Sequence, residues 1–475
     1  METINRTAPL DYLCIGLGPF NLSFACMAAP IEGLNGRVLE QSSEFNWHPN
    51  MLIDGTTLQN PFLADLVSMA DPTSPFSYLN YCKQQGRLYQ FYIREKYYLS
   101  RAEYNRYCRW AVDQLDTIKF CHTVTDISYL SHYECYVVRG CQTLADDSVQ
   151  PFQYFTKKLI IGVGSLPQFP ASVAHQVQQL KANTPQRLLH TSDYLRHKEA
   201  LKECQEITVI GSGQSGAEVF YDLLSDSAEH QYRLNWVTRS PRYFQMETAK
   251  LTLELITPDY AEYFYDLSPR VKNQVLKDHK SLYQGINASL IDQIYDALDD
   301  NHHSQACEVR LLPNLELLDI AMAPSNETFR LRFKHHQDQA EYSHQTHAVV
   351  FASGYGPKLP SFIHGIKDRI QWDDNGDYQP NRNWSVDLCG NEIFVQNAGL
   401  QGHGITNPDI GMACYRNGRI LHAITGVDYY PAEANTSFQT HQPNNDSSFK
   451  KITVSTNTDS TLHTTAHLTD TMETA

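Results

Sequence analysis

Two glycine-rich segments have the residue types and spacing that bind the phosphates of a dinucleotide. The first follows an apolar run and contains Gly16, Gly18, Pro19 and Asn21. A small first residue permits a tight turn, the second glycine lets a pyrophosphate approach the backbone, and the following helix offers free N–H groups to the anion. Asn21 replaces the usual third glycine, and Glu40 ends the next strand, where a carboxylate can bind ribose hydroxyls. A plain strand-to-helix turn is the weaker interpretation.

The second segment is a complete G-x-G-x-x-G between an apolar strand and a helix, and it comprises Gly211, Gly213, Gln214, Ser215 and Gly216. That context strongly predicts a second dinucleotide. The next strand ends in Arg239, with Arg242 close behind, and not in an acid. Cations at this place accommodate the 2′-phosphate of NADPH, so NADPH is expected in preference to NADH. The alternative for Arg239 is a solvated cation at a strand end.

Two nucleotide sites in one chain indicate that one nucleotide stays bound while the other delivers electrons. The simplest assignment is FAD at the first site and NADPH at the second, with hydride transfer between them. Strand, glycine turn, helix and strand follow in order over residues 11–40 and 207–239. We therefore predict an α/β fold, a two-dinucleotide-binding flavoprotein with Rossmann-like FAD and NADPH domains and a small substrate-binding region.

The predicted domains are not continuous in sequence. We expect an FAD-binding domain over residues 1–200 and 348–430, and an NADPH-binding domain over 201–347 whose insert 245–300 contributes to the substrate site. From residue 431 the chain is rich in Thr, Ser, Asn, Gln and His, with little apolar periodicity. Residues 431–475 are therefore predicted to be a disordered tail.

Composition excludes several classes of function. The formal charge of −15 disfavours nucleic acid, and the chain has no apolar run of about 18 residues that would span a membrane. The eleven cysteines are scattered without a C-x-x-C pair, and we expect them to be reduced in a cytoplasmic protein. His302, His303 and Cys307 are too sparse a cluster for zinc, so no metal is predicted.

Further motifs accompany the two glycine turns, and they occupy residues 45–48, 58–67, 71–81, 101–104, 352–355 and 403–405. Together they resemble the microbial N-hydroxylating flavin monooxygenases that make hydroxamate siderophore precursors from lysine, ornithine or small diamines. The resemblance extends from about residue 11 to 426, and it is nearest to the enzymes that act on putrescine or cadaverine.

The resemblance implies a mechanism and a set of site residues. NADPH reduces FAD, O₂ adds at flavin C4a, and the hydroperoxide transfers its distal oxygen to a primary amine that attacks as the free base. Gln59 and Arg101 would set flavin and cofactor geometry without acting as a base. The implied flavin contacts are Trp47, His48, Gln59, His403 and Ile405. Core packing is the alternative for Trp47, and an ordinary ion pair at a helix start is the alternative for Arg101. The family also suggests a homo-oligomer, a tetramer or a dimer.

One departure from the family pattern bears on the substrate. Enzymes acting on lysine or ornithine usually have a lysine where this chain has Ala64, and that lysine pairs with the substrate carboxylate. Leaving a buried carboxylate unpaired costs roughly 3–5 kcal/mol. Leu253 also replaces the Asn or Asp that related enzymes tend to have. A diamine is therefore expected, with Asp409 as a candidate for its far ammonium. If Ala64 is neutral drift, the substrate is L-lysine or L-ornithine.

Three other classes of protein share parts of this pattern. A pyridine nucleotide–disulfide reductase needs a redox cysteine pair, which the sequence lacks. A Baeyer–Villiger or sulfur-oxidising flavin monooxygenase would have a linker comparable to residues 190–194, but the Trp-Pro ending of the Baeyer–Villiger signature is missing. If the protein is a non-enzymatic nucleotide sensor, NADPH is expected not to reduce its flavin.

Overall fold

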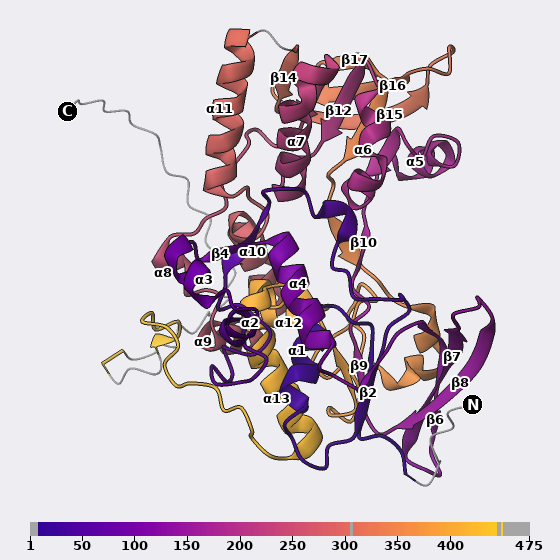
Figure 1. The fold of residues 1–475 in the computed structure, drawn as a ribbon, viewed down its shortest axis with the longest axis vertical. Coiled ribbons are helices and arrows are strands. Elements are labelled where there is room, and N and C mark those ends of the chain that lie inside the picture. Colours follow the sequence, from indigo (N-terminus) through magenta and orange to yellow (C-terminus); the bar gives the residue numbers. More distant parts are fainter. Residues whose placement is uncertain (1–7, 305–306, 444–447, 450–475) are drawn as a thin grey trace, which may run out of the picture.

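The chain forms two lobes, each built around a parallel sheet (Figure 1). The computed structural model describes residues 8–304, 307–443 and 448–449. The first lobe occupies the lower half of the view and the second the upper half. Within the described ranges, no helix combines the length and the apolar character needed to cross a membrane.

The sheet of the first lobe has the strand order β20-β9-β1-β2-β5, with every neighbouring pair parallel. Its strands are β1 (Tyr12–Ile15), β2 (Gly36–Leu39), β5 (Ile118–Lys119), β9 (Leu159–Ile161) and β20 (Ile393–Val395). Both faces are covered, and β1, β9 and β20 are buried throughout, as their apolar runs predict.

Helices cover one face of this sheet, and a smaller sheet covers the other. The helical side comprises α1 (Pro19–Ala28), α2 (Tyr78–Gln84), α4 (Arg101–Val112) and α13 (Ala413–Thr425). The opposite side comprises the antiparallel strands β6 (His122–Leu130), β7 (Cys135–Thr143) and β8 (Val149–Thr156), with the 3₁₀ segment η4 (Ser361–Arg369). α3 (Leu88–Arg94) and the short antiparallel pair β3 (Thr57–Pro61) and β4 (Tyr98–Ser100) complete this lobe's N-terminal half.

The second lobe repeats the arrangement with the strand order β11-β18-β12-β13-β14. These strands are β11 (Leu188–His190), β18 (Ala348–Phe351), β12 (Glu206–Ile210), β13 (Arg233–Val237) and β14 (Val309–Leu312). α6 (Tyr194–Lys202), α7 (Gln214–His230) and α11 (Ala288–Ser304) pack on one face. α5 (Ala174–Lys181) and the antiparallel strands β15 (Leu315–Met322), β16 (Phe329–His335) and β17 (Glu341–Thr346) lie on the other.

The observed lobe boundaries differ from the predicted domain limits at 200–201 and 347–348. Strands β11 and β18, expected in the FAD-binding domain, pair with each other and β18 pairs with β12 in the second sheet. The chain crosses between the lobes at β10 (Ser165–Pro167) and β19 (Tyr355–Pro357), which form a two-stranded antiparallel ribbon. The second lobe is therefore inserted between these two strands.

The predicted insert 245–300 reaches back toward the first lobe. It contains α8 (Lys250–Leu253), α9 (Pro258–Tyr265), α10 (Pro269–Asp278), η3 (His279–Leu282) and the first part of α11. α9 and α10 contact α12 (Leu400–His403) and η5 (Gly404–Thr406) of the first lobe. In Figure 1 the labels α8 and α10 accordingly lie beside those of the first lobe's helices.

Part of the segment predicted to be a disordered tail is bonded to this insert. Thr436 Oγ1 accepts from Asp259 N at 3.1 Å, and Phe438 N donates to Glu254 Oε1 at 3.1 Å. His441 stacks on Tyr263 with 5.6 Å between ring centroids. Disorder from residue 431 is therefore wrong for residues 436–441, because polar side chains of the tail bond to exposed groups of the insert. Residues 444–447 and 450–475 lie outside the described residues.

Both glycine turns require a residue without a side chain at their first position. Gly16 and Gly211 have φ of +88° and +121°, which L residues rarely adopt. An added Cβ would overlap the carbonyl oxygen of Gly162 in the first case and that of Ala352 in the second. The turns therefore pack directly against the neighbouring strand of each sheet.

We expect Gly211→Ala to lower the free energy of unfolding by about 2–5 kcal/mol, because it combines left-handed strain with overlap at Ala352. The matched variant Gly213→Ala should cost less than about 1 kcal/mol, since the nearest atom to its Cβ is 3.7 Å away. Urea unfolding of both variants checks this, and equal losses would contradict the packing argument.

Candidate functional site

A cavity of about 780 Å³ is lined by residues of both lobes. It collects residues that the sequence assigned to different roles. Those on its wall are Gly16, Gly18, Pro19, Asn21, Glu40, Trp47, His48, Gln59, Arg101, Ser215, Leu253, Ile405 and Asp409. Most of the predicted flavin contacts, both residues predicted to set cofactor geometry and two substrate candidates therefore border one space.

The first glycine turn is closed by Asn21, the residue that departs from the usual pattern. Its Nδ2 donates to Gly16 O at 2.7 Å, and the side chain lies so close to Gly162 that an added Cβ there would meet Asn21 Nδ2 at 2.5 Å. The usual third glycine permits close packing of helix and strand. Asn21 instead joins them through a hydrogen bond. Gly18 is the N-cap of α1 and provides no side-chain bond, and Phe20 and Asn21, which carry free N–H groups of the first turn, line the cavity.

Glu40 is held at the end of β2 by backbone amides. Its Oε2 accepts from Leu17 N at 2.7 Å and its Oε1 from Ser42 N at 2.8 Å. These bonds fix the carboxylate on the cavity wall, beside the turn. The uncapped helix, the turn without side chains and the fixed carboxylate form a cradle that fits the pyrophosphate and ribose of FAD.

Trp47 both packs and lines the cavity. Its ring lies 5.3 Å from that of Tyr104 and 5.2 Å from that of His48, and its backbone N–H donates to Asn105 Oδ1 at 2.8 Å. Trp47 therefore packs against its neighbours, as the alternative has it, and also borders the cavity, and its contact with the flavin stays a prediction. His48 has φ of 50° and starts η1 (Pro49–Met51), so its ring is directed by an unusual backbone conformation.

The second glycine turn opens α7 in the same way as the first opens α1. Gly213 is an N-cap without a side-chain bond, and Ser215 lies on the cavity wall. Arg239 and Arg242 follow β13, are exposed and lie outside the cavity lining. Within the part of the chain that the structure describes, neither side chain forms an ion pair. Both guanidinium groups are thus free to bind a phosphate.

The side chains of Gln59 and Arg101 connect the two lobes. Gln59 Nε2 lies 3.4 Å from Gln214 Oε1 and 3.3 Å from Asn287 Oδ1. Arg101, the first residue of α4, forms an ion pair with Glu218 of α7, with 2.8 Å between Nη1 and Oε2. The predicted alternative for Arg101, an ion pair at a helix start, is therefore present, but its partner comes from the other lobe.

Asp409 and Ala64 both lie close to Gly411 at the candidate substrate end; Asp409 lines the cavity, whereas Ala64 is buried behind its lining residues. A Cβ built on Gly411 would be 2.9 Å from Asp409 Oδ1 and 3.6 Å from Ala64 Cβ. Asn60 Nδ2 donates to Oδ1 and Oδ2 of Asp409 at 3.1 and 3.0 Å, and Gly411 N donates to Oδ1 at 2.7 Å. Burial raises the pKa of Asp409, and these hydrogen bonds together with the charge of Arg416 oppose that shift.

A family model described as L-lysine 6-monooxygenase/L-ornithine 5-monooxygenase matches residues 8–357, more than half of the chain. The chain belongs to this family. The resemblance inferred from the motifs is thereby confirmed, and so is the two-dinucleotide α/β fold.

Three relatives of this monooxygenase cover nearly its whole length. The alcaligin biosynthesis enzyme of Bordetella pertussis is 48% identical, covering 91% of this chain and 92% of the relative. The putrescine N-hydroxylase of Shewanella oneidensis is 44% identical, with 97% and 90% covered. The crystal structure of the FAD-bound cadaverine monooxygenase of desferrioxamine biosynthesis from Erwinia amylovora has a TM-score of 0.86 and 42% identity, with 92% and 99% covered.

His403 of the monooxygenase does not line the cavity, although the motifs implied a flavin contact. Its ring stacks on Trp384 with 3.8 Å between centroids and 14° between planes, and its Nε2 lies 3.3 Å from Arg382 O. Burial lowers the pKa of His403 to about 3. The imidazole thus packs beneath the loop that carries Ile405 and Asp409 to the cavity.

Several residues of the monooxygenase that line the cavity, and Glu218 at the lobe contact behind Arg101, were not identified from the sequence. Asn60 follows Gln59 directly and Glu218 follows the second glycine motif by two residues, so each was adjacent to a recognised signal. His122, Val124, Tyr355 and Lys358 also line the cavity. Tyr355 ends the motif at 352–355, whereas His122 and Val124 of β6 and Lys358 after β19 lie where no local pattern marks them.

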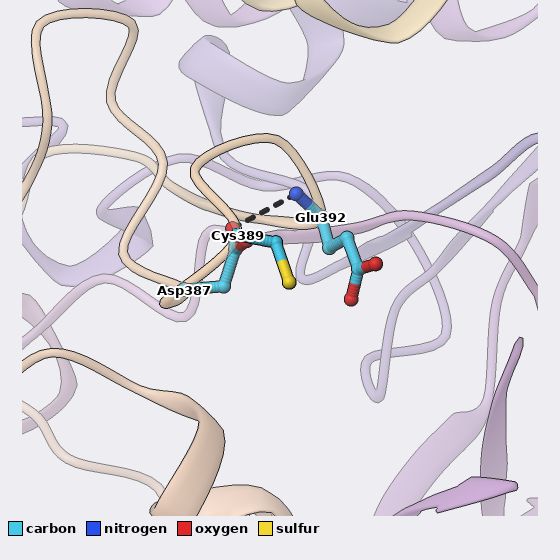
Figure 2. Close-up of side chains that lie close together, drawn as sticks. All are labelled: Asp387, Cys389 and Glu392. Carbon is cyan, nitrogen blue, oxygen red and sulfur yellow. Dashed lines mark hydrogen bonds between the residues drawn. The ribbon is translucent and has the colours of Figure 1, made fainter. Parts of the chain in front are cut away.

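The monooxygenase has one group of three potential metal ligands among its described residues, Asp387, Cys389 and Glu392 (Figure 2). Asp387 Oδ1 accepts from Glu392 N and Ile393 N, both at 2.8 Å. Glu392 pairs with Arg369 at 2.7 Å. Both carboxylates are thus used to hold the turn before β20, outside the cavity lining.

We expect His403→Phe to change how the stability of this monooxygenase depends on pH. The folded pKa of about 3 lies below the ordinary 6.5, so the unfolded chain binds a proton that the folded one does not. This proton uptake by the unfolded chain lowers the free energy of unfolding by about 1.4 kcal/mol per pH unit as pH falls below 6.5, and the His403→Phe variant lacks that effect. Urea unfolding between pH 6.5 and 4.5 should give a shallower dependence for the variant, and parallel curves would refute the assignment.

Proposed function

We propose that this protein is a FAD- and NADPH-dependent monooxygenase that N-hydroxylates a diamine, putrescine or cadaverine, for hydroxamate siderophore biosynthesis. The observation that carries the proposal is the placement of Asp409 on the cavity wall, with the buried Ala64 close to the same residue, Gly411. FAD would be held by the first glycine turn and Glu40, and NADPH by the second glycine turn with Arg239 and Arg242. Bound together, these cofactors supply the electrons that activate O₂ for transfer to the amine.

The charge at the substrate end favours a diamine over an amino acid. An amino acid would bring its α-carboxylate toward Asp409, where like charges repel and Ala64 supplies no cation. A diamine brings a second ammonium, which Asp409 can accept while Asn60 and Gly411 hold its carboxylate. The names of the relatives from Shewanella oneidensis and Erwinia amylovora, a putrescine N-hydroxylase and a cadaverine monooxygenase, agree with this charge argument.

The reacting amine must lose its proton before it can attack. With an ordinary lysine-like pKa near 10.4, only about one amine in a few thousand is neutral at pH 7. Leu253, Ile256 and Met246 add apolar surface to the same cavity wall. Such surroundings disfavour the charged form and exclude water, which favours the free base. The two ends of the cavity would thus treat the two amines of one substrate differently.

We further propose that the enzyme acts in the cytoplasm as a homo-oligomer, a tetramer or a dimer. All eleven cysteines are free, which agrees with a reducing compartment. Tyr89, Tyr92 and Ile93 on α3 expose 79%, 76% and 72% of their surface, an apolar patch suited to subunit contact. Light scattering of the purified protein measures the oligomeric state directly.

The deciding experiment follows NADPH oxidation and hydroxylamine formation with putrescine, cadaverine, lysine and ornithine. We expect coupled product formation with a diamine and little with either amino acid. Hydroxylation of lysine without diamine turnover would refute the substrate assignment, and a flavin that NADPH does not reduce would refute the enzyme class.

Two substitutions test the substrate end. Asp409→Asn should lower kcat/KM for the diamine by roughly 30-fold or more, about 2 kcal/mol, because the far ammonium loses its charged partner. Ala64→Lys should have a similar effect by pairing with Asp409 itself. The control is Leu63→Lys, since Leu63 is 46% exposed and outside the cavity lining. Steady-state rates at varied diamine concentration check this, and unchanged values for both Asp409→Asn and Ala64→Lys would contradict the role of Asp409.

NADPH selectivity is expected to depend on the cations after β13. Arg239→Ser should reduce kcat/KM for NADPH by about 10- to 100-fold, through loss of a charged hydrogen bond, and leave NADH unchanged. Arg233→Ser is the matched control, because Arg233 lies at the other end of β13 and pairs with Glu206. Equal losses with both nucleotides would show that Arg239 does not bind the 2′-phosphate.

A further inference from the structure

Glu218 is a buried carboxylate at the contact between the two lobes. Its side chain is 1% exposed, and the cation that pairs with it is Arg101, at 2.8 Å. Arg101 lines the cavity and its own side chain is 17% exposed. Glu218 belongs to α7 of the second lobe and Arg101 to α4 of the first, so this pair exists only when the lobes are docked.

The other oxygen of Glu218 orients Gln214, which in turn contacts the cavity residue Gln59. Gln214 Nε2 donates to Glu218 Oε1 at 2.8 Å, which orients the amide of Gln214. Gln214 Oε1 then accepts from Asn287 N at 2.9 Å and from Gln59 Nε2 at 3.4 Å. A single carboxylate therefore holds Arg101 directly and Gln59 through Gln214.

The burial of Glu218 makes this arrangement strongly dependent on its partners. Burial raises the pKa of Glu218, and the charge of Arg101 together with the amide of Gln214 opposes the rise. A buried carboxylate without a cation is costly, so separating the lobes would have to rehydrate both Glu218 and Arg101. The pair consequently favours the docked arrangement over an open one.

We propose that Glu218 is a positioning residue for flavin reduction, which holds the Arg101 guanidinium at the cavity wall and keeps the two lobes docked. The inference rests on the proposed function, in which one hydride passes from NADPH to the flavin and leaves NADP⁺. Hydride transfer requires close and aligned reactants, and a displacement of about 1 Å can cost a factor on the order of 100 in rate. Glu218 would act through Arg101 and Gln214 and not on the nucleotide itself.

The test variant is Glu218→Gln, which keeps the shape of the side chain and removes its charge. Anaerobic stopped-flow mixing of the FAD-loaded enzyme with saturating NADPH gives the limiting rate of flavin reduction. We expect this rate to fall roughly 5- to 150-fold, with the bound FAD content unchanged. A second readout needs no turnover. Hydrogen exchange at the Asn287 amide should become faster, because glutamine offers one acceptor oxygen to Arg101 and Gln214 where the carboxylate offers two, so Gln214 is held less firmly.

The matched control is Glu103→Gln. Glu103, on α4, is likewise a buried carboxylate and pairs with Arg87 and Arg106 at 2.7 and 2.6 Å, but neither arginine lines the cavity. Its loss should leave both the limiting rate and the exchange of Asn287 at the wild-type values. A general loss of folded structure would instead slow flavin reduction in both variants.

Action through Arg101 is tested by combining substitutions. Arg101→Lys alone should slow flavin reduction, and adding Glu218→Gln to it should slow it little further, since the two residues act as one unit. If the double variant slows flavin reduction by the product of the two single-variant factors, the proposal is overturned. Wild-type reduction and exchange in Glu218→Gln would overturn it as well.

Two further outcomes are distinguishable. If Glu218→Gln does not retain FAD, Glu218→Asp keeps the charge but shortens the side chain, so a slowed reduction supports the proposal and a wild-type rate overturns it. If NADPH does not reduce the wild-type flavin, the proposed function fails, whereas the exchange of Asn287 still shows whether Glu218 organises the contact.

Discussion

Both lobes depend on the same constraint, a contact between the first glycine of a turn and a backbone carbonyl of the adjacent strand. Gly16 lies against Gly162 and Gly211 against Ala352, with no room for a methyl group in either case. These contacts bring each turn and the start of the following helix to the carboxyl edge of its sheet, where parallel α/β sheets bind ligands. The cavity, the helix N-termini and the lobe contact all follow from that placement.

The sequence predicted most of what depends on local pattern. Each glycine turn lies between a strand and a helix as its motif predicted, and Glu40 follows β2, because strand, turn and helix are adjacent in the chain. Membership of a sheet is different, since it is decided by partners distant in sequence. Strand β18 therefore joined the second sheet against expectation, between β11 and β12.

The residues that were missed have a common physical cause. Asn60 and Glu218 are recognisable only through what they contact: Asp409 for the first and Arg101 for the second. Each pair joins segments that are far apart in the chain, and a single sequence does not reveal such pairs. His403 is the opposite case. A motif marked it as a flavin contact, but its ring packs against Trp384 and does not line the cavity.

The substrate end illustrates how a small change in side chain can reverse the charge that a site accepts. A lysine at position 64 would place a cation near Asp409, and the two would satisfy each other. With alanine there, the carboxylate remains available on the cavity wall, held by Asn60 and Gly411. In the proposed function, specificity for charge would thus be set by the absence of one ammonium group as much as by the presence of an acid.

The two-stranded ribbon formed by β10 and β19 also bears on how the chain folds. Strands β9 and β20 are neighbours in the first sheet, although the whole second lobe lies between them in sequence. Closing so long a loop from an unfolded chain carries an entropic cost that grows with its length. The second lobe begins and ends at strands that pair with each other, so its own folding brings β9 and β20 together. If the second lobe folds first, it would therefore act as a short connection between β9 and β20, and assembly of the first lobe would depend on it.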